Sequence, residues 1–207
     1  MIVRDQAIKQ VCAYLTGQKK QNLREMTVLD FFAREGDWQT SYIADRVKKI
    51  YAWEVNPEFK KNLVKNLPSD ADIQIGDSFE IAKTFEDRNI FDMLIFDNPQ
   101  GCYGQHNKYC EHFDALPFIP SLLKKTGGLV ILNVKTQPFD YDNKLLWQQR
   151  RQKFYGVQNT ASLSLEFVKN FYKGYFKAIG YETRFSFLYK RPQEPGLYSF
   201  VSKLEKI

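Results

Sequence analysis

The chain has 207 residues, which is enough for one well-buried core and too few for two full catalytic domains. Hydrophobic residues make up 43% and charged residues 26%, as in ordinary globular proteins. No segment approaches the roughly 20 continuous apolar residues that span a bilayer, and the first ten residues lack the apolar core of a secretory signal. Three cysteines are too few for a disulfide framework, so we expect a cytoplasmic protein. The net charge of +6 permits a polyanionic partner but does not require one.

The N-terminal half of the sequence predicts alternating strands and helices. Apolar residues recur at helical spacing over residues 5–15, and a basic, polar stretch follows, so residues 1–26 are predicted to form a helical extension. Beyond it, the expected strands lie at 27–33, 50–55, 71–76, 91–96 and 129–134, and the expected helices at 38–48, 56–67, 78–85 and 111–125. Pro117 and Pro120 should break the last of these helices. Such alternation is typical of a parallel sheet with helices on both faces.

The pattern changes after residue 134. A polar, aromatic stretch extends to about residue 162. The last expected elements are a helix at 163–179, ended by Gly180, and two strands at 182–190 and 198–204. Two strands with no helix between them predict an antiparallel hairpin. We therefore expect residues 27–207 to form one α/β domain with a doubly wound, mostly parallel, seven-stranded sheet and a C-terminal antiparallel hairpin.

Acidic residues end the first three expected strands: Asp30, Glu54 and Asp77. Open α/β sheets bind their ligands at the carboxyl ends of the strands, where the strand order switches. Each acid alone is also an ordinary capping or turn residue. Because three of them occupy successive strand ends, the sequence predicts a ligand site there.

The segment after the first strand resembles the DxFAGxG motif found in one subgroup of class I S-adenosylmethionine (SAM) dependent methyltransferases. It keeps Asp30, Phe32, Ala33 and Gly36. The resemblance extends from about residue 27 to the end of the chain and implies a Rossmann-like fold with SAM as the cofactor. It also implies that Glu54 binds the ribose hydroxyls and that Asp77 contacts the adenine amino group.

Arg34 stands where this family prefers a glycine. A glycine lets the backbone approach a ligand and adopt unusual dihedral angles. The Arg34 guanidinium could instead bind the methionine carboxylate of SAM, or it could block the pocket and leave the fold without the reaction. A nicotinamide dehydrogenase, the natural rival on a similar fold, would need GxGxxG at this turn, of which only Gly36 is present.

The fourth strand ends in Asp97-Asn98-Pro99-Gln100, which is similar to the DPPY or NPPF motif of amino-directed methyltransferases, especially those that act on nucleic-acid bases. The resemblance implies that Asp97 and Asn98 orient the acceptor amine. Gln100 replaces the aromatic residue that stacks on the base in that family, and Tyr103 is a candidate to supply the missing ring. The alternative interpretation is a tight turn, since all four residue types favour turns.

Both histidines and two of the three cysteines fall in the short run Cys102, His106, Cys110 and His112. Zinc prefers such ligands, but the spacing C-x3-H-x3-C-x-H matches no usual zinc pattern, and no metal ligand is assigned. Cys102 could be a nucleophile of the kind that methylates pyrimidine carbon. We favour an active-site loop in which one histidine assists proton removal or orients the substrate.

The stretch 138–155 is rich in aromatic and basic residues and is long for a connection. Its arginines, Arg150 and Arg151, could hold phosphates while aromatic rings take bases. The alternative is a helix over 143–154 that packs on the core. Both interpretations could hold for different residues.

The sequence thus favours a SAM-dependent methyltransferase that acts on RNA or DNA. The alternatives are a catalytically silent nucleic-acid-binding module with the same fold, and a methyltransferase with a protein or small-molecule acceptor. The candidate residues are Asp97, Asn98, Pro99 and Gln100 for catalysis, Asp30, Phe32, Arg34, Gly36, Glu54 and Asp77 for the cofactor, and Tyr103, His106, Arg150 and Arg151 for the substrate.

Overall fold

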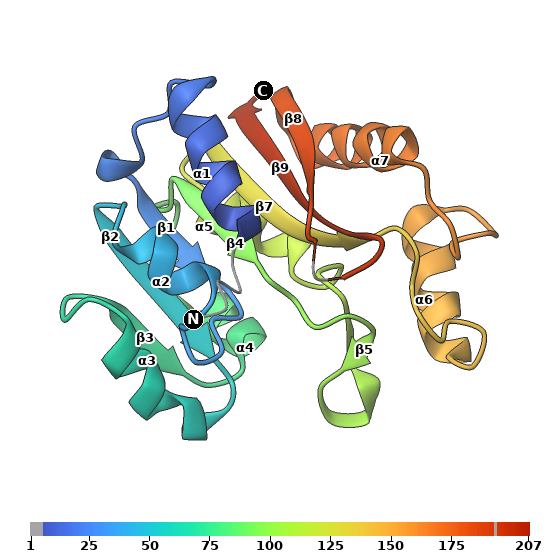
Figure 1. The fold of residues 1–207 in the computed structure, drawn as a ribbon, viewed down its shortest axis with the longest axis horizontal. Helices are drawn as coiled ribbons and strands as arrows, with labels where there is room; N and C mark the ends of the chain where they lie inside the picture. The colour runs from blue at the N-terminus through green and yellow to red at the C-terminus, as the bar shows by residue number, and fades with distance from the viewer. Residues whose placement is uncertain (1–5, 193) are drawn as a thin grey trace.

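The computed structural model describes residues 6–192 and 194–207, which form a seven-stranded sheet of order β3-β2-β1-β4-β7-β9-β8 and a separate two-stranded hairpin. The sheet strands are β1 (Thr27–Asp30), β2 (Lys49–Glu54), β3 (Asp72–Ile75), β4 (Met93–Phe96), β7 (Gly127–Lys135), β8 (Tyr181–Lys190) and β9 (Leu197–Lys206). Strand β9 runs antiparallel to both of its neighbours, whereas the other pairs are parallel. The predicted fold class is confirmed (Figure 1).

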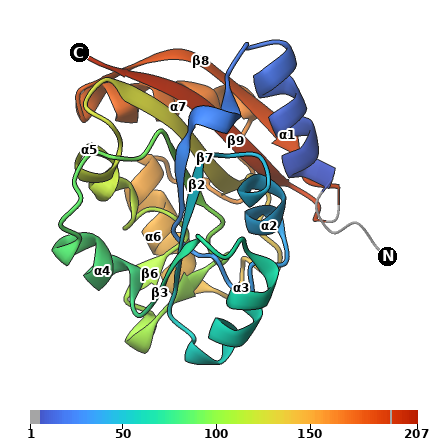
Figure 2. The same cartoon turned by 90° about the vertical axis from the view of Figure 1, so that its left-hand side faces the viewer.

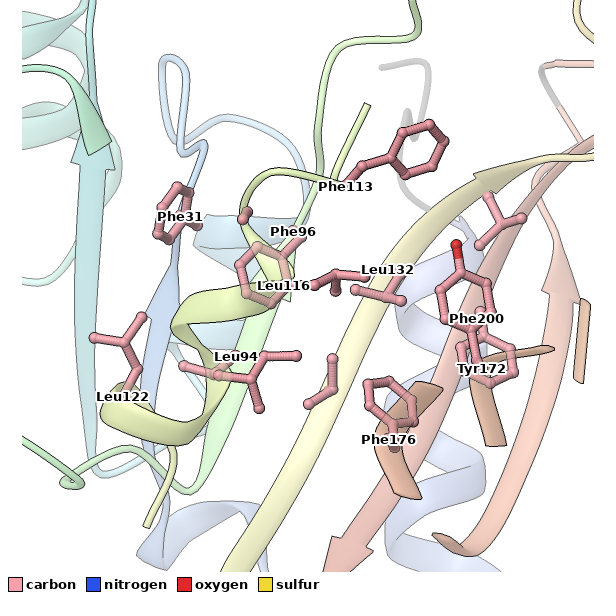
Figure 3. Packing of buried hydrophobic residues seen from close by; sticks show 14 of the residues in the cluster. Phe31, Leu94, Phe96, Phe113, Leu116, Leu122, Leu132, Tyr172, Phe176 and Phe200 are labelled. Atoms are coloured by element: carbon pink, nitrogen blue, oxygen red, sulfur yellow. The ribbon is translucent and has the colours of Figure 1, made fainter. Parts of the chain in front are cut away.

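Helices cover both faces of this sheet (Figure 2). One face carries α1 (Gln6–Gly17), α2 (Gln39–Ala44) and α3 (Lys60–Asn66), and the other carries α4 (Ser78–Thr84), α5 (Ile119–Leu122), α6 (Leu145–Tyr155) and α7 (Leu165–Ala178). The strands supply both cores because successive side chains point to opposite faces. In β4, for example, Leu94 joins the core beneath α4–α7, while Met93 and Ile95 join the core beneath α1–α3. Figure 3 shows Leu94 among Phe31, Phe96 and Leu132.

The residues before β1 share the core of the sheet. Ile8, Val11 and Leu15 of α1 are buried together with Val28 of β1 and Val201 of β9. The predicted helix over 5–15 is present from residue 6, and residues 1–5 lie outside the described residues. Within the described part of the chain, none of the helices combines the length and apolar character that crossing a membrane requires.

Three predicted segments differ from the structure. The helix expected over 38–48 ends at Ala44. The helix expected over 111–125 is reduced to a 3-10 turn at Leu116–Phe118 and the short α5, because the two prolines each occupy the first turn of a new helix. The run between residues 102 and 110 forms a hairpin of β5 (Cys102–Tyr103) and β6 (Tyr109–Cys110), which the sequence did not predict.

Candidate active site

A cavity of about 750 Å³ opens at the carboxyl ends of the parallel strands. This volume falls in the range of roughly 300–1,000 Å³ that is usual for small-molecule sites. The strand ends and adjoining loops contribute Phe32, Arg34, Trp38, Glu54, Asp77, Phe79 and Asn133. The loop after β4 contributes Asp97, Asn98, Pro99, Gln100 and Tyr103, the hairpin contributes Lys108 and Tyr109, and the β8–β9 turn contributes Arg191, Glu194 and Leu197. The cavity therefore collects most of the residues that the sequence placed in the site.

The turn after β1 has its acid beneath the cavity wall and not in it. Asp30 is buried, and its carboxylate accepts hydrogen bonds from Thr40 Oγ1 at 2.7 Å and from the Phe32 amide at 3.3 Å. Burial raises the pKa of Asp30 from 3.8 to about 7, and the nearby carboxylates of Asp97 and Glu54 add to the rise. Asp30 does not line the cavity. Its expected direct contact with a cofactor is thus replaced by a role in fixing the turn.

Gly36 has a similar supporting role. Its φ of +69° is unfavourable for other residues, and a Cβ added to it would lie 3.1 Å from Leu63 Cδ2. Gly36 does not line the cavity, so the expectation of direct cofactor contact is corrected here too. The glycine allows α3 to pack closely behind the turn.

Arg34 takes the left-handed conformation that a glycine would adopt more easily, with a φ of +52°. Its amide donates a hydrogen bond to Glu54 Oε2 at 2.7 Å, which fastens the turn after β1 to the end of β2. The side chain is exposed, lines the cavity and places its guanidinium 4.6 Å from the centre of the Trp38 ring. The guanidinium therefore stands at the cavity wall with N–H donors for an anion.

Glu54 is buried at the end of β2 and also lines the cavity. Besides the bond from Arg34, its Oε1 accepts a hydrogen bond from the Asn56 amide at 2.8 Å. Two backbone donors hold the carboxylate in one orientation. A carboxylate has about four acceptor positions, so Glu54 retains capacity for hydroxyl groups of a ligand.

Asp77 follows β3 and caps α4, because its Oδ1 accepts a hydrogen bond from the Phe79 amide at 2.9 Å. Its Oδ2 accepts a second bond from the Tyr109 hydroxyl at 3.0 Å. The Tyr109 ring lies against Phe79, with centroids 3.7 Å apart and planes 12° from parallel. The β5–β6 hairpin thus closes over the end of β3. Sequence reasoning missed Tyr109, although its place in an aromatic run next to Lys108 was a signal.

The loop after β4 contains unsatisfied polar atoms. Asn98 is buried, and its side-chain amide donates to the Pro99 carbonyl at 3.1 Å, while Gln100 donates to the Asn98 carbonyl at 3.2 Å. The side-chain oxygens of Asn98 and Gln100 are buried and accept no hydrogen bond from the described residues. Buried polar atoms are normally paired. These two acceptors in the cavity wall therefore point to a ligand that donates hydrogen bonds.

Asp97 forms an ion pair that the sequence did not suggest. Arg191 Nη1, at the end of β8, donates to Asp97 Oδ1 at 2.8 Å, and both side chains line the cavity. The two residues are 94 positions apart in the chain. Arg191 also lies over Trp38, with its guanidinium carbon 5.8 Å from the ring centre. Asp97 is thus held in place by a cation, and its carboxylate remains an acceptor at the cavity surface.

The cysteine and histidine run separates in space. Cys102 and Cys110 are paired across the β5–β6 hairpin. His106 is exposed at the hairpin tip and does not line the cavity, whereas His112 is buried and hydrogen-bonded to the Tyr172 hydroxyl. Among the described residues, no group of three or more His, Cys, Asp and Glu side chains could hold a metal ion. Neither histidine is therefore placed in the cavity for proton transfer.

Tyr103 is the member of this region that reaches the cavity. Its hydroxyl donates a hydrogen bond to the Glu111 carbonyl at 2.7 Å, and its ring meets Phe32 edge-on at 6.0 Å. Cys102 does not line the cavity. Burial raises the pKa of the neighbouring Cys110 thiol, which opposes thiolate formation there.

Arg150 and Arg151 occupy different environments. Arg150 is partly exposed and pairs with Asp114 at 3.0 Å. Arg151 is fully buried, and its Nη1 donates to Glu111 Oε1 at 2.5 Å while its Nη2 donates to the Lys135 carbonyl at 2.8 Å. The prediction that Arg151 contacts phosphate is therefore wrong, because its guanidinium faces the interior. The helical alternative for this stretch is the one observed, as α6.

Comparisons with known proteins identify the fold. No protein-family model matches the sequence, and no curated protein matches it. The solved structures that resemble it include the Burkholderia thailandensis 1,6-didemethyltoxoflavin-N1-methyltransferase with 1,6-didemethyltoxoflavin and S-adenosylhomocysteine bound (TM-score 0.59, 16% identity, covering 97% of this chain and 78% of that one). They also include M. jannaschii TYW2 in complex with AdoMet (TM-score 0.56, 17% identity, 94% and 77%). A third is P. horikoshii TYW2 in complex with MeSAdo (TM-score 0.53, 19% identity, 90% and 58%).

The chain thus spans 58% of the length of the P. horikoshii TYW2 structure and 59% of a further P. horikoshii protein that it resembles. Strand order, the single antiparallel strand β9 and the position of the cavity agree with these structures in kind. The protein has the class I methyltransferase fold.

Proposed function

We propose that the protein is a SAM-dependent methyltransferase whose acceptor is a nucleic acid. The observation that carries the proposal is the cavity at the carboxyl ends of the parallel strands, where Glu54, Asp77 and the Asp97–Gln100 segment meet around about 750 Å³. A fold alone does not determine chemistry, so the support must come from these side chains.

The residues of the cavity fit the chemical groups of SAM. Glu54 presents oriented acceptors for ribose hydroxyls, Asp77 stands at the next strand end for the adenine amino group, and the Arg34 guanidinium can pair with a carboxylate. The buried oxygens of Asn98 and Gln100 await a hydrogen-bond donor. When bound, SAM supplies an activated methyl group for in-line displacement.

The segment after β4 would orient the acceptor. Asp97 offers a carboxylate oxygen to an acceptor N–H, and Arg191 fixes that carboxylate by holding its other oxygen. Asn98 adds a neutral acceptor beside it. In this arrangement the chain contributes positioning, because the methyl donor is already reactive and the two reacting atoms must be held in line.

The surface around the cavity supports a polyanionic acceptor. The net charge is +6, and Arg34 and Lys108 are exposed side chains at the cavity wall. The rings of Tyr103 and Phe32 line the same cavity and provide faces for a base. A small-molecule acceptor is the second candidate, since the B. thailandensis structure of the same fold contains 1,6-didemethyltoxoflavin.

Isothermal titration calorimetry with S-adenosylhomocysteine tests the cofactor assignment. Wild-type protein should bind one equivalent, and Glu54→Ala should weaken binding by about 1.5–3 kcal/mol, the scale of hydrogen bonds to charged groups. Glu58→Ala, which removes an exposed carboxylate nearby, is the matched control and should bind normally. Failure of the wild-type protein to bind either S-adenosylhomocysteine or SAM would refute the proposal.

A further inference from the structure

A second hollow, of about 540 Å³, lies on the face of the molecule that carries α1 and α2. It shares no lining residue with the first cavity. Residues of α1, the segment 20–24 that follows it, and Tyr42 and Arg46 form its wall. Its charged lining residues are Lys20, Arg24 and Arg46, with no aspartate or glutamate among the described lining residues. The hollow is therefore suited to an anion.

Two of these cations are fixed in place by backbone carbonyls. Arg46 Nη1 donates to the Tyr42 carbonyl at 2.8 Å, and Arg24 Nη1 donates to the Asp45 carbonyl at 2.8 Å. A guanidinium has five N–H donors, so each arginine retains donors for a further partner. Holding the side chains in advance lowers the entropy cost of binding an anion.

Arg46 is also supported by an aromatic ring. Its guanidinium carbon lies 3.5 Å from the centre of the Tyr42 ring, and Lys9 Nζ lies 5.6 Å from the same centre. A guanidinium plane laid on a ring presents its outer face as a flat surface. Nucleic-acid bases stack on such planes as well as on aromatic rings.

This arrangement continues toward the first cavity. Trp38, which lines that cavity, immediately precedes α2, and Tyr42 lies four residues later, one helical turn along the same side. Trp38 carries Arg34 and Arg191 as Tyr42 carries Arg46. Cations and aromatic rings therefore alternate from the first cavity to the second hollow, on the side of the sheet where Figure 2 shows α2 below α1.

We propose that the second hollow and this row form a track for single-stranded nucleic acid, which leads the acceptor strand to the first cavity. The proposal rests on the proposed nucleic-acid acceptor. Fixed guanidiniums would hold phosphates, and the Tyr42–Arg46 stack would take a base, which is how sequence-tolerant single-strand sites work. An acidic lipid surface fits less well because Leu23, the large apolar residue of the wall, is buried.

Fluorescence anisotropy with a labelled oligouridine of about 15 nucleotides at low salt tests the track. Arg24→Gln combined with Arg46→Gln should weaken binding about tenfold or more and reduce the salt slope by about 2, roughly one unit per lost phosphate contact. Lys169→Gln combined with Lys173→Gln removes the same charge from exposed positions of α7 and should have little effect. Arg46→Lys, which keeps the charge but loses the planar stack, should weaken binding by an intermediate factor.

Several results would overturn the track. These are equal losses in the two double variants, no oligonucleotide binding at low salt, or phosphatidylserine vesicles that bind with the same dependence on Arg24 and Arg46. Calorimetry with S-adenosylhomocysteine separates this inference from the proposed function. If the cofactor product binds but the oligonucleotide ignores Arg24 and Arg46, the track is wrong and the methyltransferase assignment stands. If the oligonucleotide depends on them and S-adenosylhomocysteine does not bind, the track stands and the enzymatic assignment fails.

Discussion

The molecule contains two arginine–carboxylate pairs with different surroundings. Arg191 and Asp97 are 8% and 11% exposed and line the cavity, whereas Arg151 and Glu111 are both 0% exposed and lie outside it. The open pair joins the end of β4 to the end of β8. The sealed pair joins the segment after β6 to α6, and Arg151 also reaches the last carbonyl of β7.

The same chemistry therefore serves two purposes. In the sealed pair, Glu111 Oε1 also accepts a hydrogen bond from Trp147 Nε1 at 2.7 Å, so it links three positions of the chain and no ligand can reach it. In the open pair, the Asp97 carboxylate faces a space large enough for a ligand. Access to the cavity, and not the ion pair itself, distinguishes a candidate catalytic group from a structural one.

Breaking the sealed pair should have the largest effect on stability. Arg151→Ala leaves the Glu111 carboxylate buried without its cation, which should lower the free energy of unfolding by about 3–5 kcal/mol. Arg150→Ala is the matched control, because Arg150 is the adjacent residue in a half-exposed pair worth about 0–1 kcal/mol. Urea denaturation followed by circular dichroism measures both. Similar losses in the two variants would show that burial does not set the strength of these pairs.

Breaking the open pair should instead affect the reaction. Asp97→Ala should bind S-adenosylhomocysteine normally yet lose methyl transfer by about 10²-fold or more, because the lost hydrogen bond strengthens toward the transition state. Transfer of labelled methyl from SAM to unmodified RNA or DNA is the readout. A fully active Asp97→Ala enzyme would eliminate the proposed role of this residue.

Cys102→Ser gives the contrast for that experiment. It should retain substantial activity if an acceptor nitrogen is the target, since Cys102 does not line the cavity. Loss of all activity in a folded Cys102→Ser protein would move the assignment from amine to carbon methylation.

The sealed region should also respond to pH in a particular direction. Burial, assisted by the charge of Arg151, lowers the pKa of His112 from 6.5 to about 3. The unfolded chain therefore takes up a proton at His112 below pH 6.5, whereas the folded chain does not until about pH 3, so stability falls as the pH drops through this window. At pH 5 the loss from this residue should be about 2 kcal/mol.

Denaturation midpoints at pH 7.5 and pH 5 test this expectation. His112→Gln should reduce the pH dependence, because glutamine can still bond to Tyr172 but does not titrate. His106→Gln, at the exposed hairpin tip, should keep the pH dependence of the wild type. An unchanged slope in His112→Gln would contradict the burial argument.

The sequence was informative about the strand ends for a simple reason. The carboxyl ends of parallel strands meet at one edge of the sheet, so acids that end successive strands, such as Glu54, Asp77 and Asp97, must come together. The arginine that pairs with Asp97 could not be found in this way. Arg191 lies 94 residues away, and nothing local shows that β8 ends at the same cavity.

The basic run in α6 teaches a different lesson. Its two adjacent arginines have the same composition around them, so composition alone does not tell which one is buried. Helical spacing does, because Trp147, Arg151 and Tyr155 are four residues apart and all three are buried. The period of the helix, applied to a polar residue, was the available signal.

A crystal structure of the protein soaked with S-adenosylhomocysteine tests the central claim most directly. The account predicts density in the first cavity, with the ribose hydroxyls within hydrogen-bond distance of Glu54 and the sulfur directed toward Asp97. Density at any other place, or a ligand whose ribose lies away from Glu54, would contradict the assignment of this cavity as the cofactor site.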